Sequence, residues 1–162
     1  MLRLTLTTAL ILICAAASFA EAWVNNGQSW THKNGLSVSF PAAYKVKAER
    51  NGTLTVTGQE GFVNIVFTPV SGKEAMKEAM DGLLMVMRQA KVQLKTESTT
   101  ATQNGVNIAY QEGACKSNGV PIYVKLGIFN RKDSYLLMQL LVPNQVLPDN
   151  KKDIDSITSS VK

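Results

Sequence analysis

The feature that most constrains the fold is a change in the spacing of apolar residues in mid-chain. Over residues 36–70, and again over 95–142, apolar side chains alternate with polar ones, as expected for half-buried β-strands. Between these stretches, apolar residues over 75–90 recur at spacings of three and four, which indicates an amphipathic α-helix of about 20 residues. Helices segregated from runs of strands are typical of an α+β domain.

Asn–Gly pairs, which favour tight hairpin turns, separate several of the expected strands. The predicted strands, in chain order, lie within residues 30–40, 44–56, 62–70, 95–103, 106–111, 120–129 and 135–142. The polar, threonine-rich stretch at 95–103 suits the edge of a sheet. We therefore expect an antiparallel β-sheet of about six to eight strands, covered by one long central helix and a short C-terminal helix.

Polar residues mark where the two helices should begin. Ser71, followed three residues later by Glu74, forms a capping box that would satisfy free amides at the start of the long helix. Asp149 or Asn150 is expected to cap the closing helix. Both helices have one apolar face, so each should cover a surface of the sheet.

The N-terminal segment has the order of features found in a secretory signal peptide. Arg3 precedes an apolar stretch over 4–17, and small residues then offer cleavage after Ala20 or Ala22. The alternatives fit less well, because an uncleaved anchor needs about 20 consecutive apolar residues and lipidation of Cys14 needs a small residue before it. We predict a signal peptide over 1–20 and a single α+β domain over 21–162. The mature protein is expected to be periplasmic or secreted, without a stable membrane anchor after cleavage.

The charge of the mature chain limits the classes of partner that are expected, and its cysteine content limits the disulfides that it can form. Loss of Arg3 leaves 16 basic and 12 acidic residues, and the basic residues are scattered. No dense basic run marks a nucleic-acid site, so no nucleic-acid partner is expected. Cys115 is the one cysteine left, which excludes an internal disulfide. It is either a small buried residue or a free thiol, and pairing with a cysteine of another chain is a further alternative.

No grouping of residues in the sequence matches a catalytic or metal-binding pattern. His32 is the single histidine, which is too few for a multi-histidine zinc site and favours a packing or surface role. We predict no catalytic residue, no cofactor and no metal, and hence a protein that is not an enzyme. A hydrolase that uses His32 with a remote serine is a further alternative.

Methionines on the expected long helix are the remaining candidates for a site. Met76, Met80 and Met87 share one helix face with Leu83, as core residues would. Thioethers also make adaptable surfaces for partners, so the same three methionines are the candidate partner surface. Because thioethers ligate copper(I), copper binding is the third interpretation.

Residues 35–41, Gly-Leu-Ser-Val-Ser-Phe-Pro, form a strand that ends in an aromatic residue and a proline. With the order of paired strands, long helix, meander and final short helix, this segment resembles the PsbP/DcrB/Mog1 group over residues 28–161. The resemblance implies an antiparallel sheet between helices. Members of the group differ in role, including photosystem assembly, binding of a nucleotide-exchange partner and chaperoning of hydrophobic segments of secreted toxins. They share no catalytic motif.

The pattern and the resemblance lead to one expected function and one alternative. We expect an exported, non-catalytic α+β domain that binds a protein partner of unknown identity, as a chaperone, an assembly factor or an inhibitor. The alternative is an envelope protein that binds a small ligand or a metal in a cleft beneath the long helix.

Overall fold

The computed structural model of the protein describes residues 23–58 and 60–162. The expected signal peptide over 1–20, with its candidate cleavage sites Ala20 and Ala22, lies outside the described residues and stays a prediction. Within the described part of the chain, no helix combines the length and the apolar character needed to cross a membrane.

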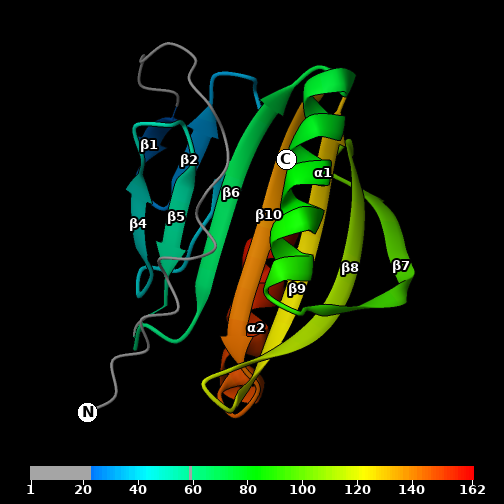
Figure 1. The fold of residues 1–162 in the computed structure, drawn as a ribbon. Helices are drawn as coiled ribbons and strands as arrows, with labels where there is room; N and C mark the ends of the chain where they lie inside the picture. The colour runs from blue at the N-terminus through cyan, green and yellow to red at the C-terminus, as the bar shows by residue number, and fades with distance from the viewer. Residues whose placement is uncertain (1–22, 59) are drawn as a thin grey trace.

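The described chain contains two antiparallel sheets and two helices (Figure 1). The small sheet has the order β1 (Trp23–Asn26), β2 (Ser29–His32) and β3 (Ser37–Ser39). The large sheet has seven strands in the order β4 (Lys45–Ala48), β5 (Leu54–Thr57), β6 (Asn64–Ser71), β10 (Ser134–Pro143), β9 (Val120–Arg131), β8 (Val106–Ser117) and β7 (Gln93–Gln103). The helices are α1 (Lys73–Gln89) and α2 (Leu147–Ser159). This arrangement confirms the α+β class, the long helix, the short closing helix and the polar edge strand.

Two-residue turns close the β7–β8 and β8–β9 hairpins as their Asn–Gly pairs predict, whereas the β4–β5 hairpin at Asn51–Gly52 has a longer turn. Both residues of Asn104–Gly105 and of Asn118–Gly119 have positive φ, which is the requirement of the type I′ turn. The first hairpin, β1–β2, was not predicted, although Asn26–Gly27 at its turn carries the same signal. Trp23 in β1 is buried and its Nε1 donates a hydrogen bond to the Gly52 carbonyl at 2.8 Å, so this strand is tied to the β4–β5 turn.

The capping box predicted at Ser71 and Glu74 is wrong. Ser71 is the last residue of β6 and pairs with Ser134 of β10, so it belongs to the sheet rather than to the helix. The cap residue is Gly72, with φ of 88°, and no side chain caps the helix. The chain has to turn sharply from strand to helix at this point, and a glycine without a Cβ adopts the positive φ that the turn needs.

The predicted cap of the closing helix is also wrong. The helix α2 begins at Leu147, earlier than expected, and Val146 is its cap residue without a side-chain hydrogen bond. Pro148 lies in the first turn, where its fixed φ suits a helix and its missing N–H costs nothing. Asp149 therefore lies inside the first turn, and the Asn150 side chain donates back to the Val146 carbonyl at 2.8 Å.

The two faces of the large sheet have separate cores. On one face, residues of the small sheet and α2 form a single cluster with Phe67, Phe129 and Leu136. On the other face, α1 buries Met76 and Met87 against the sheet. Figure 1 shows α1 in front of β10 and β9 and α2 behind them. Each helix thus covers a sheet surface, as its apolar face predicts.

Candidate functional site

The helix α1 covers only part of its face of the sheet. Its buried residues contact side chains from β6, β10 and β9, whereas β8 and β7 extend beyond it (Figure 1). Leu94 is half-buried, and every other residue of β7 is exposed. Leu94 and Cys115 still pack at the edge of the α1 cluster, so the uncovered part of this face is the turn end of the β7–β8 hairpin with the adjoining edge of β9.

Cross-strand register lines up the side chains of the uncovered part in rows. Thr100 of β7 is paired with Ala109 of β8, and Ala109 is paired with Ile128 of β9. Ile128 is in turn paired with Leu137 of β10, which is buried under α1 beside Met76. Because paired residues share a face of the sheet, this row runs from the core under α1 to the part of the sheet that α1 leaves exposed.

A second row lies two residues further along the strands, on the same face of the sheet. Thr102 is paired with Asn107, Asn107 with Asn130, and Asn130 with Tyr135. The apolar row and this amide-rich row are neighbours. Together they present an apolar floor beside groups that form hydrogen bonds.

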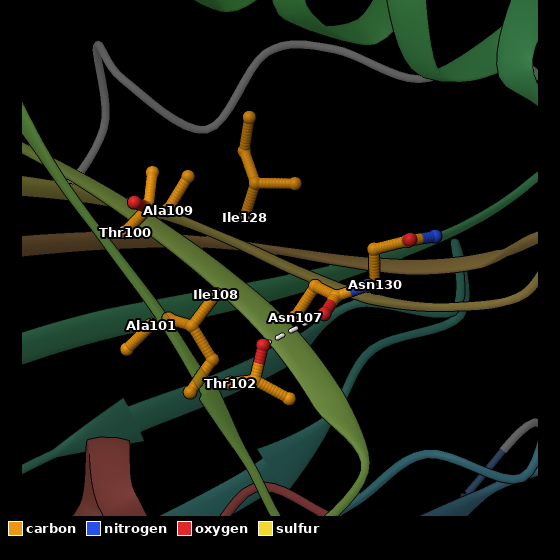
Figure 2. Close-up of a pocket in the computed structure, with 8 residues that line it drawn as sticks. All are labelled: Thr100, Ala101, Thr102, Asn107, Ile108, Ala109, Ile128 and Asn130. Carbon is orange, nitrogen blue, oxygen red and sulfur yellow. Dashed lines mark hydrogen bonds between the residues drawn. The ribbon is translucent and has the colours of Figure 1, made fainter.

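A pocket of about 480 Å³ lies over these rows. Figure 2 shows Thr100, Ala109 and Ile128 on one side of the strands, with Ala101 and Ile108 pointing to the other side. The residues that line the pocket are Thr100, Ala101, Thr102, Asn107, Ile108, Ala109, Ile128 and Asn130. None of these eight side chains carries a charge, so the pocket suits an uncharged ligand surface.

Hydrogen bonds fix two of the polar groups in the pocket. The Thr102 hydroxyl donates to Asn107 Oδ1 at 3.0 Å, as the dashed line in Figure 2 shows. Asn130 Nδ2 donates to the carbonyls of Lys132 at 2.7 Å and Ser134 at 3.3 Å. Among the described residues, Asn107 Nδ2, Asn130 Oδ1 and the Thr100 hydroxyl have no side-chain hydrogen bond, so a ligand has one donor, one acceptor and one hydroxyl to meet.

A charged cluster lies beyond the pocket, where β7 bulges away from β8. Glu112 Oε2 accepts a hydrogen bond from Lys95 Nζ at 2.8 Å, and its Oε1 accepts one from the Tyr123 hydroxyl at 2.7 Å. These bonds hold the pKa of Glu112 below its ordinary value. Lys125 lies over the Tyr110 ring at 4.2 Å, and burial lowers its pKa. The cluster ties the β7 bulge to β8 and β9.

His32 is a packing residue, which is one of the two roles that the sequence predicted for it. It is 6% exposed, and its ring lies 5.0 Å from that of Trp23. Its Nδ1 accepts a hydrogen bond from the Asn34 amide at 3.2 Å, and burial lowers its pKa. Across residues 23–58 and 60–162, no three His, Cys, Asp or Glu side chains are grouped as a metal site would require.

Cys115 is half-buried at the edge of the cluster under α1. Burial raises the pKa of its thiol, so the thiol is protonated at neutral pH. This placement agrees with the interpretation of Cys115 as a small packing residue.

The three candidate methionines on α1 differ in how far they are buried. Met76 is 8% exposed and Met87 is 1% exposed, and both belong to clusters between α1 and the sheet. Met80 is half-buried and packs at the same cluster as Ile128 of the pocket floor. The structure thus places Met76 and Met87 in the core, and Met80 nearest to the uncovered rows. Whether any of the three contacts a partner stays a prediction.

The pocket residues were not singled out from the sequence. The available signal was the polar stretch at 95–103, which predicted an edge strand without an apolar face. Rows such as Thr100, Ala109 and Ile128 become visible only when the register of three strands is known.

Comparison with known proteins gives structural neighbours at low sequence identity. The solution structure of cyanobacterial PsbP (CyanoP) from Synechocystis matches with a TM-score of 0.62 at 9% identity, covering 94% of this chain and 98% of that one. LpqN of Mycobacterium tuberculosis, described as involved in cell envelope biogenesis, matches with a TM-score of 0.53 at 11% identity, covering 90% and 91%.

A protein from Bacteroides thetaiotaomicron matches with a TM-score of 0.57 at 11% identity, covering 85% of this chain and 48% of that one. No protein-family model and no curated sequence matches this chain. At these identities the likeness concerns the fold alone. The described chain therefore has the PsbP-like fold that the order of its elements implied.

Proposed function

We propose that this protein is an exported, non-catalytic domain that binds a protein partner, as a chaperone, an assembly factor or an inhibitor. The observation that carries the proposal is the uncovered continuation of the core rows, from Leu137 under α1 to Thr100 on β7. A rigid sheet presents an apolar floor and unpaired amide and hydroxyl groups there. A polypeptide surface, which is itself apolar in part and rich in amides, is complementary to this composition.

Two further observations support a partner rather than a reaction. The charged cluster at Glu112 is engaged in hydrogen bonds that hold the β7 bulge, and His32 is packed against Trp23. These ionisable groups therefore have structural contacts on other parts of the molecule and are not among the residues that line the pocket.

Site-specific photo-crosslinking tests the proposal with a matched pair of variants. A crosslinkable residue at Thr102 is introduced into the wild type, Ala109→Arg and Ala48→Arg, and each purified protein is returned to the envelope fraction of the source organism. Ala109 points into the pocket from β8, whereas Ala48 is an exposed strand alanine at the opposite edge of the sheet (Figure 2). We expect one discrete adduct that Ala109→Arg abolishes and Ala48→Arg retains. Adducts that are equal in both variants, or absent from the wild type, contradict the proposal.

Export is tested separately by the mass of the protein recovered from the source organism. Cleavage after Ala20 or Ala22 gives a chain that begins at Glu21 or Trp23. Recovery of the chain with Met1 intact would contradict export while leaving partner binding open to the crosslinking test.

The second candidate is an envelope protein that binds a small ligand or a metal, and the volume of the pocket favours its small-ligand form. A volume of about 480 Å³ lies within the range of small-molecule sites, roughly 300–1,000 Å³. Thermal unfolding with copper(I), lipids or cell-wall fragments distinguishes this candidate, because a ligand at 100 times its Kd stabilises the fold by about 2.7 kcal/mol. Stabilisation of the wild type but not of Ala109→Arg would favour a small ligand in the pocket.

A further inference from the structure

The outer edge of β7 is the longest free strand edge in the described part of the large sheet. Strand β7 has 11 residues and ends the sheet on one side, whereas β4, which ends it on the other side, has four. A free edge presents unpaired backbone N–H and C=O groups to any extended chain that approaches. Proteins usually block such edges with charges, bulges or prolines.

The first half of β7 carries these blocking features. Lys95 and Glu97 supply charges, and the pairing with β8 shifts register between Leu94 and Ser98. The hydrogen bond from Lys95 to Glu112 holds this bulged half in place. The short edge strand β4 is protected as well, because Lys45 and Lys47 occupy two of its four positions.

The second half of β7 has none of these features. Residues 98–103, Ser-Thr-Thr-Ala-Thr-Gln, contain no charge and no proline, and they pair with β8 in unbroken register. All six residues are exposed. At the rise of an extended strand, this open half offers an edge of about 20 Å.

The open half of the edge coincides with the pocket. Thr100, Ala101 and Thr102 are both the middle of the open edge and one wall of the pocket. A chain paired with this edge would place every second side chain on the α1 side of the sheet, beside Thr100 and Thr102. The side chains it places there meet an uncharged lining, and a charge buried there would have no partner among the lining residues.

We propose that residues 98–103 accept an extended, uncharged polypeptide segment of the partner as an eighth strand of the large sheet. The inference rests on the proposed function and gives the chemistry of the partner. Backbone hydrogen bonds to β7 supply the affinity, and the pocket selects uncharged side chains at alternate positions. A partner segment fits better than a second copy of this chain, because residues 98–103 of a second copy would bring mostly small side chains to a pocket of about 480 Å³.

Selection from a library of random eight-residue peptides provides the probe. The library is displayed on phage and panned against the wild-type domain, with counter-selection against Thr100→Lys, which adds to the open half the kind of charge that blocks the first half. We expect selected peptides without charges at alternate positions, and amide exchange by NMR should slow at residues 98–103 when the peptide binds.

Matched variants and a modified peptide separate strand addition from other modes of binding. Thr100→Lys should lower the affinity for the selected peptide by roughly tenfold or more. Thr96→Lys, in the half that is already blocked, should leave this affinity within about twofold of the wild-type value. N-methylation of alternate backbone amides, in the set that faces β7, should abolish binding. Melting temperatures of both variants verify that each is folded.

Three outcomes would overturn the proposal. They are equal binding of the N-methylated peptide, protection of amides away from residues 98–103, and concentration-dependent dimers that Thr100→Lys dissolves. If the crosslink that Ala109→Arg abolishes is found but no peptide binds the edge, strand addition fails and the proposed function stands. If both the crosslink and the peptides are absent, both fail.

Discussion

The centre of the large sheet and its β7–β8 end differ in how many of their faces are covered. In β10, residues 136–140 are all buried, because α1 lies over one face and α2 with the small sheet lies over the other. In β7, one residue is half-buried and the others are exposed. Both strands belong to the same hydrogen-bonded sheet. Position relative to the helices, rather than strand pairing, therefore decides which residues stabilise the fold and which are exposed for binding.

The comparison is tested most strongly by Phe67→Ala. Phe67 is buried, and its ring lies 5.9 Å from that of Phe40 and 6.5 Å from that of Phe129. Loss of the ring leaves a cavity and should lower the free energy of unfolding by about 3–5 kcal/mol in urea denaturation. Thr99→Ala in β7 serves as the control, with an expected change within about 0.5 kcal/mol. Similar losses for the two variants would mean that the two regions do not differ as described.

The second prediction concerns the one tight contact in the β7–β8 end. A Cβ at Gly113 would lie 2.7 Å from the Gln93 carbonyl oxygen and 2.9 Å from Leu94 Cδ2, so Gly113→Ala must displace the start of β7. We expect a loss of about 1–3 kcal/mol in the free energy of unfolding. At Gly127, a Cβ would meet Tyr110 Cε1 at 3.1 Å and Met138 Cε at 3.2 Å, which are longer contacts and involve side-chain rather than backbone atoms. Gly127→Ala should therefore cost less, and the reverse order would refute this explanation.

The third prediction is a gain of stability under α1. Gln139 is 9% exposed, and its Nε2 has no hydrogen-bond partner among the described residues. Gln139→Leu removes this unsatisfied donor and should raise the free energy of unfolding by about 1–2 kcal/mol.

Gln111 provides the matched control for Gln139. It lies on the same face of the sheet, where both residues are paired with Leu126 from opposite sides. Its Nε2 donates to the Lys95 carbonyl at 2.7 Å, so Gln111→Leu loses a hydrogen bond and should bring no gain. If both substitutions stabilise the protein equally, apolar burial rather than the unpaired amide is the cause.

The smallest expected effect is the pH dependence of Glu112→Gln. Hydrogen bonds from Lys95 and Tyr123 lower the pKa of Glu112 in the folded state, so its contribution to stability is complete above the unfolded value near 4.5. That contribution is lost as the pH falls through the lower, folded-state pKa. Because the pair is largely exposed, the wild type should exceed the variant by less than about 1 kcal/mol at pH 7.

Urea midpoints of the wild type and Glu112→Gln, measured from pH 7 to pH 2, follow this difference. The difference should shrink toward low pH and should also shrink in a Lys95→Met background. A difference that grows as the pH falls would show that the ion pair does not lower the pKa of Glu112.

Local patterns predicted most of the elements and failed where an element is defined by a distant partner. The turns at Asn104–Gly105 and Asn118–Gly119 depend on two adjacent residues, and they formed as predicted. Ser71 looked like a helix cap because its partner Ser134, far along the chain, was not visible from the sequence. The same limit hid the candidate site, whose rows join Thr100, Ala109 and Ile128 from three strands.

The sequence by itself determined the α+β class, the order of strands and helices along the chain, and the polar character of the β7 edge. Those properties follow from hydrophobic period and turn residues, which act over a few residues of chain. The tertiary structure decided that α1 lies over β10 and β9, because Met76 and Met87 are closely packed there with buried side chains of β6, β10 and β9. That placement left the turn end of the β7–β8 hairpin uncovered on the α1 face, and it is the reason that a pocket lies at residues 100–102.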